Sequence, residues 1–162
     1  VSLNSGTTTF ALARALRRVS GITLVTNSPR IATLLQDAPA AGQTVILLGG
    51  VRTPSDALVG PLAAAALRTL HVDLCFLGVH GISERQGLTT PNMMEAEINR
   101  LFLDRCDRSV VLADSTKWGM SGLYRIAGLD EVDSVITDDG LAAEHRETLS
   151  RFVPDLRLEP VR

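Results

Sequence analysis

The sequence predicts an α/β fold of three layers, a mostly parallel sheet with helices on both faces. Short apolar runs alternate along the chain with segments whose apolar residues recur at helical spacing. The short runs are apolar throughout rather than at every second residue, which is typical of parallel strands buried on both faces. No internal repeat or low-complexity linker divides the 162 residues, so we expect a single domain over 1–162.

The expected strands are the apolar runs that end in glycine or in small polar residues. The first is a stub at 1–3, so we expect the chain to be a fragment that opens within a strand. Further strands are expected at 22–25, 44–48, 72–77, 109–112 and 134–137, with a brief strand at 57–59 and an edge strand at 156–161. Loops are expected at 38–42, 80–91 and 118–121 and a turn at 126–129; the second loop is long enough to carry function.

Helices are expected between these strands. They begin near residues 7, 29, 61, 92 and 141. Ser28 precedes a proline and is therefore expected to cap the second helix. Asn92 and Glu95 have the spacing of a capping box, in which each side chain bonds to the other residue's backbone N–H.

Composition and charge exclude several function classes. The chain has 16 Lys and Arg against 18 Asp and Glu, a net charge of -2, so this segment by itself should not bind DNA strongly. No apolar run is long enough to cross a membrane and no signal peptide is recognisable, which predicts a cytoplasmic protein without a membrane partner. Cys75 and Cys106 lack any disulfide or metal framework and are expected to be reduced thiols. The scattered histidines predict no metal, and the absence of G-x-G-x-x-G after the first strand predicts no dinucleotide cofactor.

The strongest candidate for a phosphate site is the turn Asn4-Ser5-Gly6-Thr7-Thr8. It joins a strand to a helix, where free N–H groups and the positive end of the helix dipole converge. Its glycine leaves room for an anion and its hydroxyl groups add donors. Lys117, the only lysine among the 16 basic residues, is expected to face the same anion. Two simpler interpretations stay open, because Ser5 and Thr7 could cap the helix and Lys117 could be a solvated loop cation.

Small or polar residues end five of the expected strands, and parallel strands present their carboxyl ends at one edge of a sheet. Ligands of such sheets bind at that edge, which favours a polar crevice for a phosphorylated, hydroxyl-rich small molecule. Glu95 could orient sugar hydroxyls or act as a base, or it could only complete the helix cap. Arg52 and Arg85 lie in polar loops and could reach the ligand, and His80 lies near the crevice.

Eight short motifs occur in order along the chain. They are Asn4-Ser5-Gly6-Thr7-Thr8, Val25-Thr26-Asn27, Leu48-Gly49-Gly50, Phe76-Leu77-Gly78-Val79-His80-Gly81-Ile82, Gly87-Leu88-Thr89, Glu95-Ala96, Ala113-Asp114-Ser115-Thr116-Lys117 and Val135-Ile136-Thr137-Asp138. In this order and spacing they resemble the C-terminal sensor domain of the DeoR family of bacterial transcription regulators, over nearly the whole chain. The residues then expected on the sugar side of the ligand are Asn4, Thr26, Asn27, Gly49, Gly50, Arg52, Gly78, His80, Gly81, Thr89, Glu95 and Asp114.

The resemblance implies a fold related to ribose-5-phosphate isomerase and the CoA-transferase-like proteins. It also implies a repressor that senses a phosphorylated sugar or related metabolite, assembles as a homo-oligomer and binds DNA only through a helix-turn-helix domain absent from this chain. Effector binding is expected to shift the domain between two arrangements. The family pattern has an aspartate where this chain has Asn4, which removes a charge near the phosphate and is expected to alter effector choice.

Two enzymatic functions compete with this interpretation. A sugar-phosphate isomerase needs a carboxylate base at the substrate carbon, and Glu95 is the only obvious candidate, without the acidic and lysine-glycine-rich stretches of such enzymes. A CoA-transferase needs a glutamate nucleophile, which the sequence does not identify. We therefore expect a sensor domain rather than an enzyme.

Overall fold

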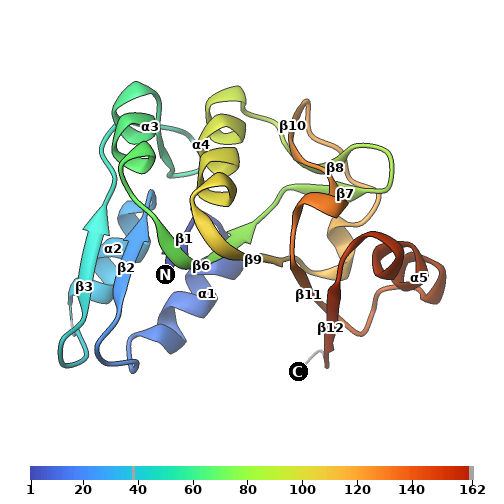
Figure 1. Ribbon diagram of the computed structural model, residues 1–162, viewed down its shortest axis with the longest axis horizontal. Coiled ribbons are helices and arrows are strands. Elements are labelled where there is room, and N and C mark those ends of the chain that lie inside the picture. Colours follow the sequence, from blue (N-terminus) through green and yellow to red (C-terminus); the bar gives the residue numbers. More distant parts are fainter. Residues whose placement is uncertain (38, 161–162) are drawn as a thin grey trace.

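The computed structural model describes residues 1–37 and 39–160. Seven strands form one sheet in the order β12-β11-β9-β6-β1-β2-β3, and every pairing in this sheet is parallel. Helices cover both faces of the sheet (Figure 1), which confirms the predicted three-layer α/β fold.

The seven strands of this sheet fall at or near the strands expected from the sequence. They are β1 (Ser2–Leu3), β2 (Thr23–Thr26), β3 (Thr44–Leu47), β6 (Val72–Gly78), β9 (Cys106–Leu112), β11 (Ser134–Asp138) and β12 (Asp155–Glu159). The brief strand expected near residue 58 is β5 (Leu58–Val59), which pairs antiparallel with β4 (Val51–Arg52). Residues Ala38 and Val161, at the limits of an expected loop and of the expected last strand, lie outside the described residues.

Five helices pack on the sheet and enclose two cores. They are α1 (Thr7–Leu16), α2 (Pro29–Gln36), α3 (Pro61–Arg68), α4 (Met93–Asp104) and α5 (Ala143–Phe152), counted over the described residues. One core lies beneath α1 and α2 and includes Leu3, Leu24 and Leu35. The larger core lies beneath α3 and α4 on the opposite face, and Leu149 of α5 joins it.

The predicted loop at 80–91 is wrong, because this segment forms an antiparallel hairpin. Strands β7 (Gly81–Ser83) and β8 (Gly87–Thr90) pair with each other, and β10 (Tyr124–Ala127) adds to β8 where a turn was expected at 126–129. Gly87 has a φ of +69°, and a Cβ there would lie 2.2 Å from the Ala127 carbonyl oxygen, so only glycine fits this crossing. These strands have three or four residues each and little apolar alternation, which hides them from a periodicity argument.

The order of the strands reverses next to β1. From β1 the chain builds outward through β2 and β3 on one side, and through β6, β9, β11 and β12 on the other. A reversal of this kind opens a crevice at the carboxyl ends of the two strands that flank it. The fold therefore predicts a site above β1 and β6, which end at Leu3 and Gly78.

Candidate functional site

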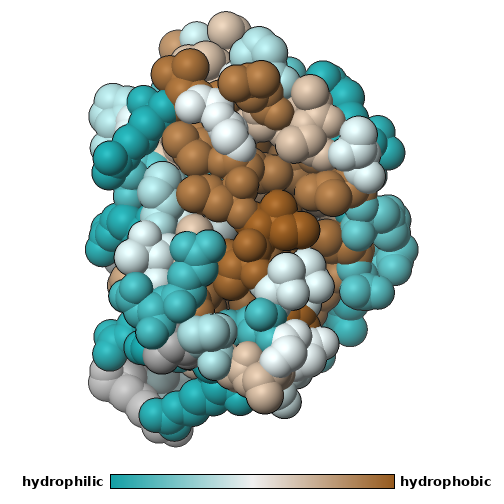
Figure 2. All heavy atoms as spheres, turned by 90° about the vertical axis from the view of Figure 1, so that its left-hand side faces the viewer, coloured by the Kyte–Doolittle hydropathy of each residue, from teal (hydrophilic) through white to brown (hydrophobic). Residues whose placement is uncertain are grey.

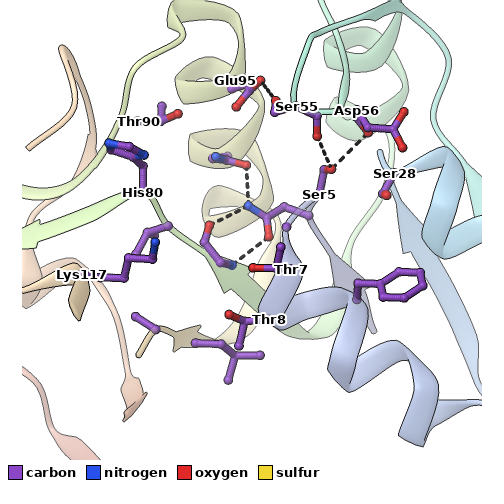
Figure 3. A pocket seen from close by; sticks show the side chains of 18 of the residues that line it. Ser5, Thr7, Thr8, Ser28, Ser55, Asp56, His80, Thr90, Glu95 and Lys117 are labelled. Atoms are coloured by element: carbon purple, nitrogen blue, oxygen red, sulfur yellow. Dashed lines mark hydrogen bonds between the residues drawn. The ribbon is translucent and has the colours of Figure 1, made fainter. Parts of the chain in front are cut away.

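A cavity of about 400 Å³ lies at the carboxyl ends of β1 and β6. Its walls come from the turn that follows β1, the start of α1, the β4–β5 hairpin, the start of α4 and the segment that follows β9. Figure 3 shows Lys117 and His80 on one side, Thr7 and Thr8 at the start of α1, and Ser55 and Glu95 on the facing side. The structure thus assembles six chain segments, residues 4–10, 28–30, 55–56, 78–80, 90–99 and 112–117.

All five residues predicted for the phosphate line this cavity, namely Ser5, Gly6, Thr7, Thr8 and Lys117. Helix α1 begins at Thr7 with Gly6 as its N-cap, and no side chain in the described part of the chain caps its first N–H groups. The simpler interpretation, in which Ser5 and Thr7 cap the helix, is wrong. Ser5 Oγ instead donates to the carbonyl oxygens of Ser55 and Asp56 at 3.2 and 3.1 Å. The positive end of α1 therefore faces the cavity with its amide donors open.

Lys117 reaches the cavity from a short 3-10 helix, η1 (Ser115–Lys117), at the end of β9. Asp114 caps this turn by accepting from the Thr116 N–H at 3.0 Å. Asp138, at the end of β11, accepts from the Ser115 N–H at 2.6 Å, and this bond holds the pKa of the Asp138 carboxyl below its usual value. Within the described residues no carboxylate pairs with the Lys117 ammonium, so the cation is available to a ligand.

Asn4 lines the cavity, but the scaffold occupies its side-chain hydrogen bonds. Its Nδ2 donates to the Gly78 carbonyl oxygen at 2.8 Å and to Asn99 Oδ1 at 3.1 Å, and its Oδ1 accepts from the Gly78 N–H at 2.8 Å. The residue is 2% exposed. Asn4 thus joins the ends of β1 and β6 to α4 and shapes the floor of the cavity.

Glu95 does not complete a capping box, which corrects the prediction from spacing. Asn92 Oδ1 alone caps α4, by accepting from the N–H groups of Met94 and Glu95 at 2.9 and 3.2 Å. The Glu95 carboxylate accepts instead from Ser55 Oγ at the cavity wall. Ser55, 40 residues away in sequence, thus takes the place of the Asn92 backbone as the partner of this side chain. Local residue spacing cannot reveal so distant a partner.

The β4–β5 hairpin supplies cavity residues that the sequence analysis missed. Ser55 and Asp56 lie in its turn, where Asp56 has a φ of 63°, unusual for a residue other than glycine. Asp56 Oδ1 pairs with Arg52 Nε at 2.5 Å, and its buried Oδ2 has no hydrogen-bond partner among the described residues. The only sequence signal was the polar, turn-like composition of this segment. Further wall residues that were missed are Phe10, Ser28, Arg30, Thr90, Pro91 and Asn99.

Several predicted site residues do not line the cavity. They are Thr26, Asn27, Gly49, Gly50, Arg52, Gly81, Thr89 and Asp114, and Arg85 is also absent from the wall. Asn27 shows the structural role of such residues, since its Oδ1 accepts from the Ser5 N–H at 2.9 Å and its Nδ2 donates to the Leu58 carbonyl at 3.2 Å. Gly50 permits the hairpin to close, because a Cβ there would lie 2.3 Å from the Val59 carbonyl oxygen. Of the predicted sugar-side set, Asn4, Gly78, His80 and Glu95 line the cavity.

Among the described residues, His, Cys, Asp and Glu side chains form no group of three or more that could hold a metal ion. None of the helices in that part of the chain has the length and hydrophobicity that a membrane span requires.

An α/β domain with a polar, partly cationic cavity at its strand switch point belongs to the class of small-molecule sensor or enzyme domains. The sequence comparison decides between these classes. Residues 1–139 match the model of the DeoR C-terminal sensor domain, and the chain belongs to this family. It is a sensor domain rather than an enzyme, since the relatives it matches are named as transcriptional regulators.

The similar proteins include regulators from archaea and bacteria. The chain is 38% identical over 150 residues to the HTH-type transcriptional regulator GlpR of Haloferax volcanii, over 92% of this chain and 58% of that protein. It is 36% identical to the HTH-type transcriptional regulator GolR of Listeria innocua over 86% of this chain and 54% of that protein. It is 34% identical to the HTH-type transcriptional repressor GlcR of Bacillus subtilis over 85% of this chain and 52% of that protein. The chain thus spans a little over half the length of these relatives.

Proposed function

We propose that the cavity binds a phosphorylated sugar or a closely related phosphorylated metabolite, and that this binding controls DNA binding by a longer regulator of which this chain is the sensor. The observation that carries the proposal is that the open start of α1 and Lys117, which has no carboxylate partner within the described residues, line one cavity. Amide donors and an ammonium group together suit a phosphate dianion better than either does alone.

The remainder of the cavity suits a ligand rich in hydroxyl groups. Glu95 and Asp56 provide carboxylates on the wall formed by α4 and the hairpin. His80 and Thr90 add polar groups that could donate or accept. Because carboxylates would repel the phosphate, this polarity orients the ligand with its phosphate at α1 and its hydroxyls toward Glu95 and Asp56.

The cavity also has a size that fits this class. A volume of about 400 Å³ lies at the lower end of the range typical of small-molecule sites, about 300–1,000 Å³, and holds a pentose or hexose phosphate more readily than a dinucleotide.

The regulatory part of the proposal rests on the relatives. They carry helix-turn-helix names, and each extends well beyond the region matched here. We infer that a DNA-binding domain of that kind completes the protein. The protein then binds DNA only through that domain. A ligand changes the DNA affinity only if it binds the two arrangements of the protein with different affinity.

A thermal-shift screen tests the ligand class. Pentose phosphates, hexose phosphates and glycerol phosphate are compared with the same compounds without phosphate and with inorganic phosphate alone. A ligand present at about 100 times its Kd raises the free energy of unfolding by roughly 2.7 kcal/mol. Stabilisation by a subset of the phosphorylated compounds is the expected result. Equal stabilisation by the unphosphorylated forms, or none by any compound, would contradict the proposal.

A further inference from the structure

The two edges of the seven-stranded sheet differ in a way that the ligand site does not explain. At one edge, β12 carries Asp155, Arg157 and Glu159 at every second position, and Asp155 pairs with Arg157 at 3.0 Å. Charges at such spacing are a common protection of an edge strand against pairing with another chain. These charges disfavour association at the β12 edge.

The opposite edge, at β3, has no such protection. Residues 41–51 contain no charged residue and no proline. Leu47 and Val51 are 41% and 61% exposed, and Val45 and Ile46 beside them are only partly buried. Figure 2 views the molecule from this side and shows apolar residues gathered across the middle of the face, with hydrophilic residues around them. We call Val45, Ile46, Leu47 and Val51 the β3 edge.

The backbone of β3 is also free to pair. The N–H groups of Thr44 and Leu48 donate inward to the carbonyls of Ile22 and Thr26 in β2. Since successive residues of a strand point in opposite directions, the N–H and C=O groups of Val45 and Leu47 point outward. No strand of the described chain pairs with them.

We propose that the β3 edge is an interface with a second copy of this chain. A twofold axis makes two copies of an edge strand run antiparallel, so that the outward groups of Val45 and Leu47 in each copy pair with those of the other. The same apolar side chains then meet their own copies, and no charge is desolvated. An exposed apolar edge without charge matches itself in this arrangement.

The position of Val1 favours a second copy over a preceding segment of the same chain. Val1 lies directly before β1, where its nitrogen donates to the Thr23 carbonyl oxygen at 2.9 Å. The neighbours of β1 on both sides are filled by β2 and β6, so chain before Val1 leaves at the amino ends of the strands. The exposed apolar residues lie at the opposite, carboxyl end of β3 and just beyond it, with β2 in between.

Mass measurement with matched variants tests this interface, and it needs no ligand. Leu47→Glu places a charge on the β3 edge, and Leu158→Glu places the same charge at a residue of similar exposure, 39%, on the other edge strand. At tens of micromolar, the wild type and Leu158→Glu are expected at twice the 17.3 kDa chain mass, and Leu47→Glu at the chain mass. Val51→Glu, on the exposed hairpin, repeats the test if Leu47→Glu proves unfolded by circular dichroism.

Hydrogen exchange then locates the contact. The Val45 and Leu47 amides are expected to exchange at least tenfold more slowly in the wild type than in the monomeric variant. A monomeric wild type, a dimer that survives both β3-edge variants, equal effects of Leu47→Glu and Leu158→Glu, or unchanged exchange at Val45 and Leu47 would each overturn the proposal.

Discussion

The Asn4 carboxamide and the Gly78 peptide form two reciprocal hydrogen bonds, both 2.8 Å long. The pair continues the contact between β1 and β6 one step beyond the end of β1, using a side chain in place of backbone. The second hydrogen of Asn4 Nδ2 goes to Asn99 on α4. The floor of the cavity is therefore fixed by an amide that acts as donor and acceptor at once.

Replacement of Asn4 by aspartate, the residue of the family pattern, should destabilise this chain. An ionised aspartate has no hydrogen to donate, so it would face the Gly78 carbonyl and Asn99 Oδ1 with like partial charges. Leaving such a buried group unsatisfied costs about 1–3 kcal/mol of unfolding free energy. Urea unfolding at pH 7 measures this loss, and the loss should shrink in acid, where a protonated carboxyl can donate again.

Asn92→Asp is the matched control for that change. Asn92 uses only its oxygen, as the cap of α4, and aspartate caps a helix about as well as asparagine. We expect its stability to stay within about 0.5 kcal/mol of wild type. An equal loss in both variants would show that the Asn4 amide has no special role.

Lys117→Ala should weaken the binding of a phosphosugar found by the thermal screen. The ammonium has no carboxylate partner within the described chain, so its removal should leave the fold unchanged. A charge-assisted hydrogen bond of about 1.5–3 kcal/mol corresponds to a loss of roughly ten- to a hundredfold in affinity. Calorimetric titration measures it, with Arg85→Ala as a cationic control outside the cavity. Identical affinities for wild type and Lys117→Ala would place the phosphate elsewhere.

Gly6→Val should block the approach of an anion to α1. A Cβ at Gly6 would lie 3.2 Å from Thr9 Oγ1, and its methyl groups would enter the space in front of the first helical amides. Affinity for the phosphosugar should fall about tenfold or more, which corresponds to about 1.4 kcal/mol. Gly49→Val is the control, because a Cβ there meets nothing within 4 Å and the residue does not line the cavity. Calorimetry should find its affinity unchanged.

At the start of α4, one substitution should lower the stability of the fold and another should lower ligand affinity. Asn92→Ala removes the observed cap and should cost about 1 kcal/mol of unfolding free energy. Glu95→Gln leaves that cap intact, so its stability should stay within about 0.5 kcal/mol of wild type, but it removes a charged acceptor from the cavity wall. Its phosphosugar affinity should fall about tenfold. The capping-box prediction would be restored if Glu95→Gln lost as much stability as Asn92→Ala.

The stabilising contribution of the Asp138 carboxylate should be lost in acid. Its carboxylate accepts from the Ser115 N–H, which lowers its pKa in the folded state. The folded state then binds fewer protons than the unfolded state below the ordinary Asp pKa of about 3.9, so this contribution is complete above that pH and is lost as pH falls through the folded pKa. Urea unfolding from pH 6 into this acid range should show a smaller decline for Asp138→Asn than for wild type. The unfolding free energy of the control variant Glu84→Gln, at the exposed β7–β8 turn, should decline as much as that of wild type.

The sequence by itself determined the layers of this protein and the residues that line its candidate site at the start of α1. Buried parallel strands are continuously apolar and helices follow their own period, so both can be read locally, as the runs that became β6 and β9 show. The turn from Asn4 to Thr8 is likewise local, since one strand, one glycine and one helix start define it.

Only the tertiary structure decided which polar residues face the cavity. Glu95 turns to Ser55 instead of its own helix, and Asn27 holds the Ser5 backbone instead of lining the wall. Asp56 enters the site from a hairpin whose turn carried no distinctive motif. For Glu95 and Asn27 the partner lies more than 20 residues away. The choice between a local and a distant hydrogen bond is settled by tertiary packing, which residue spacing does not encode.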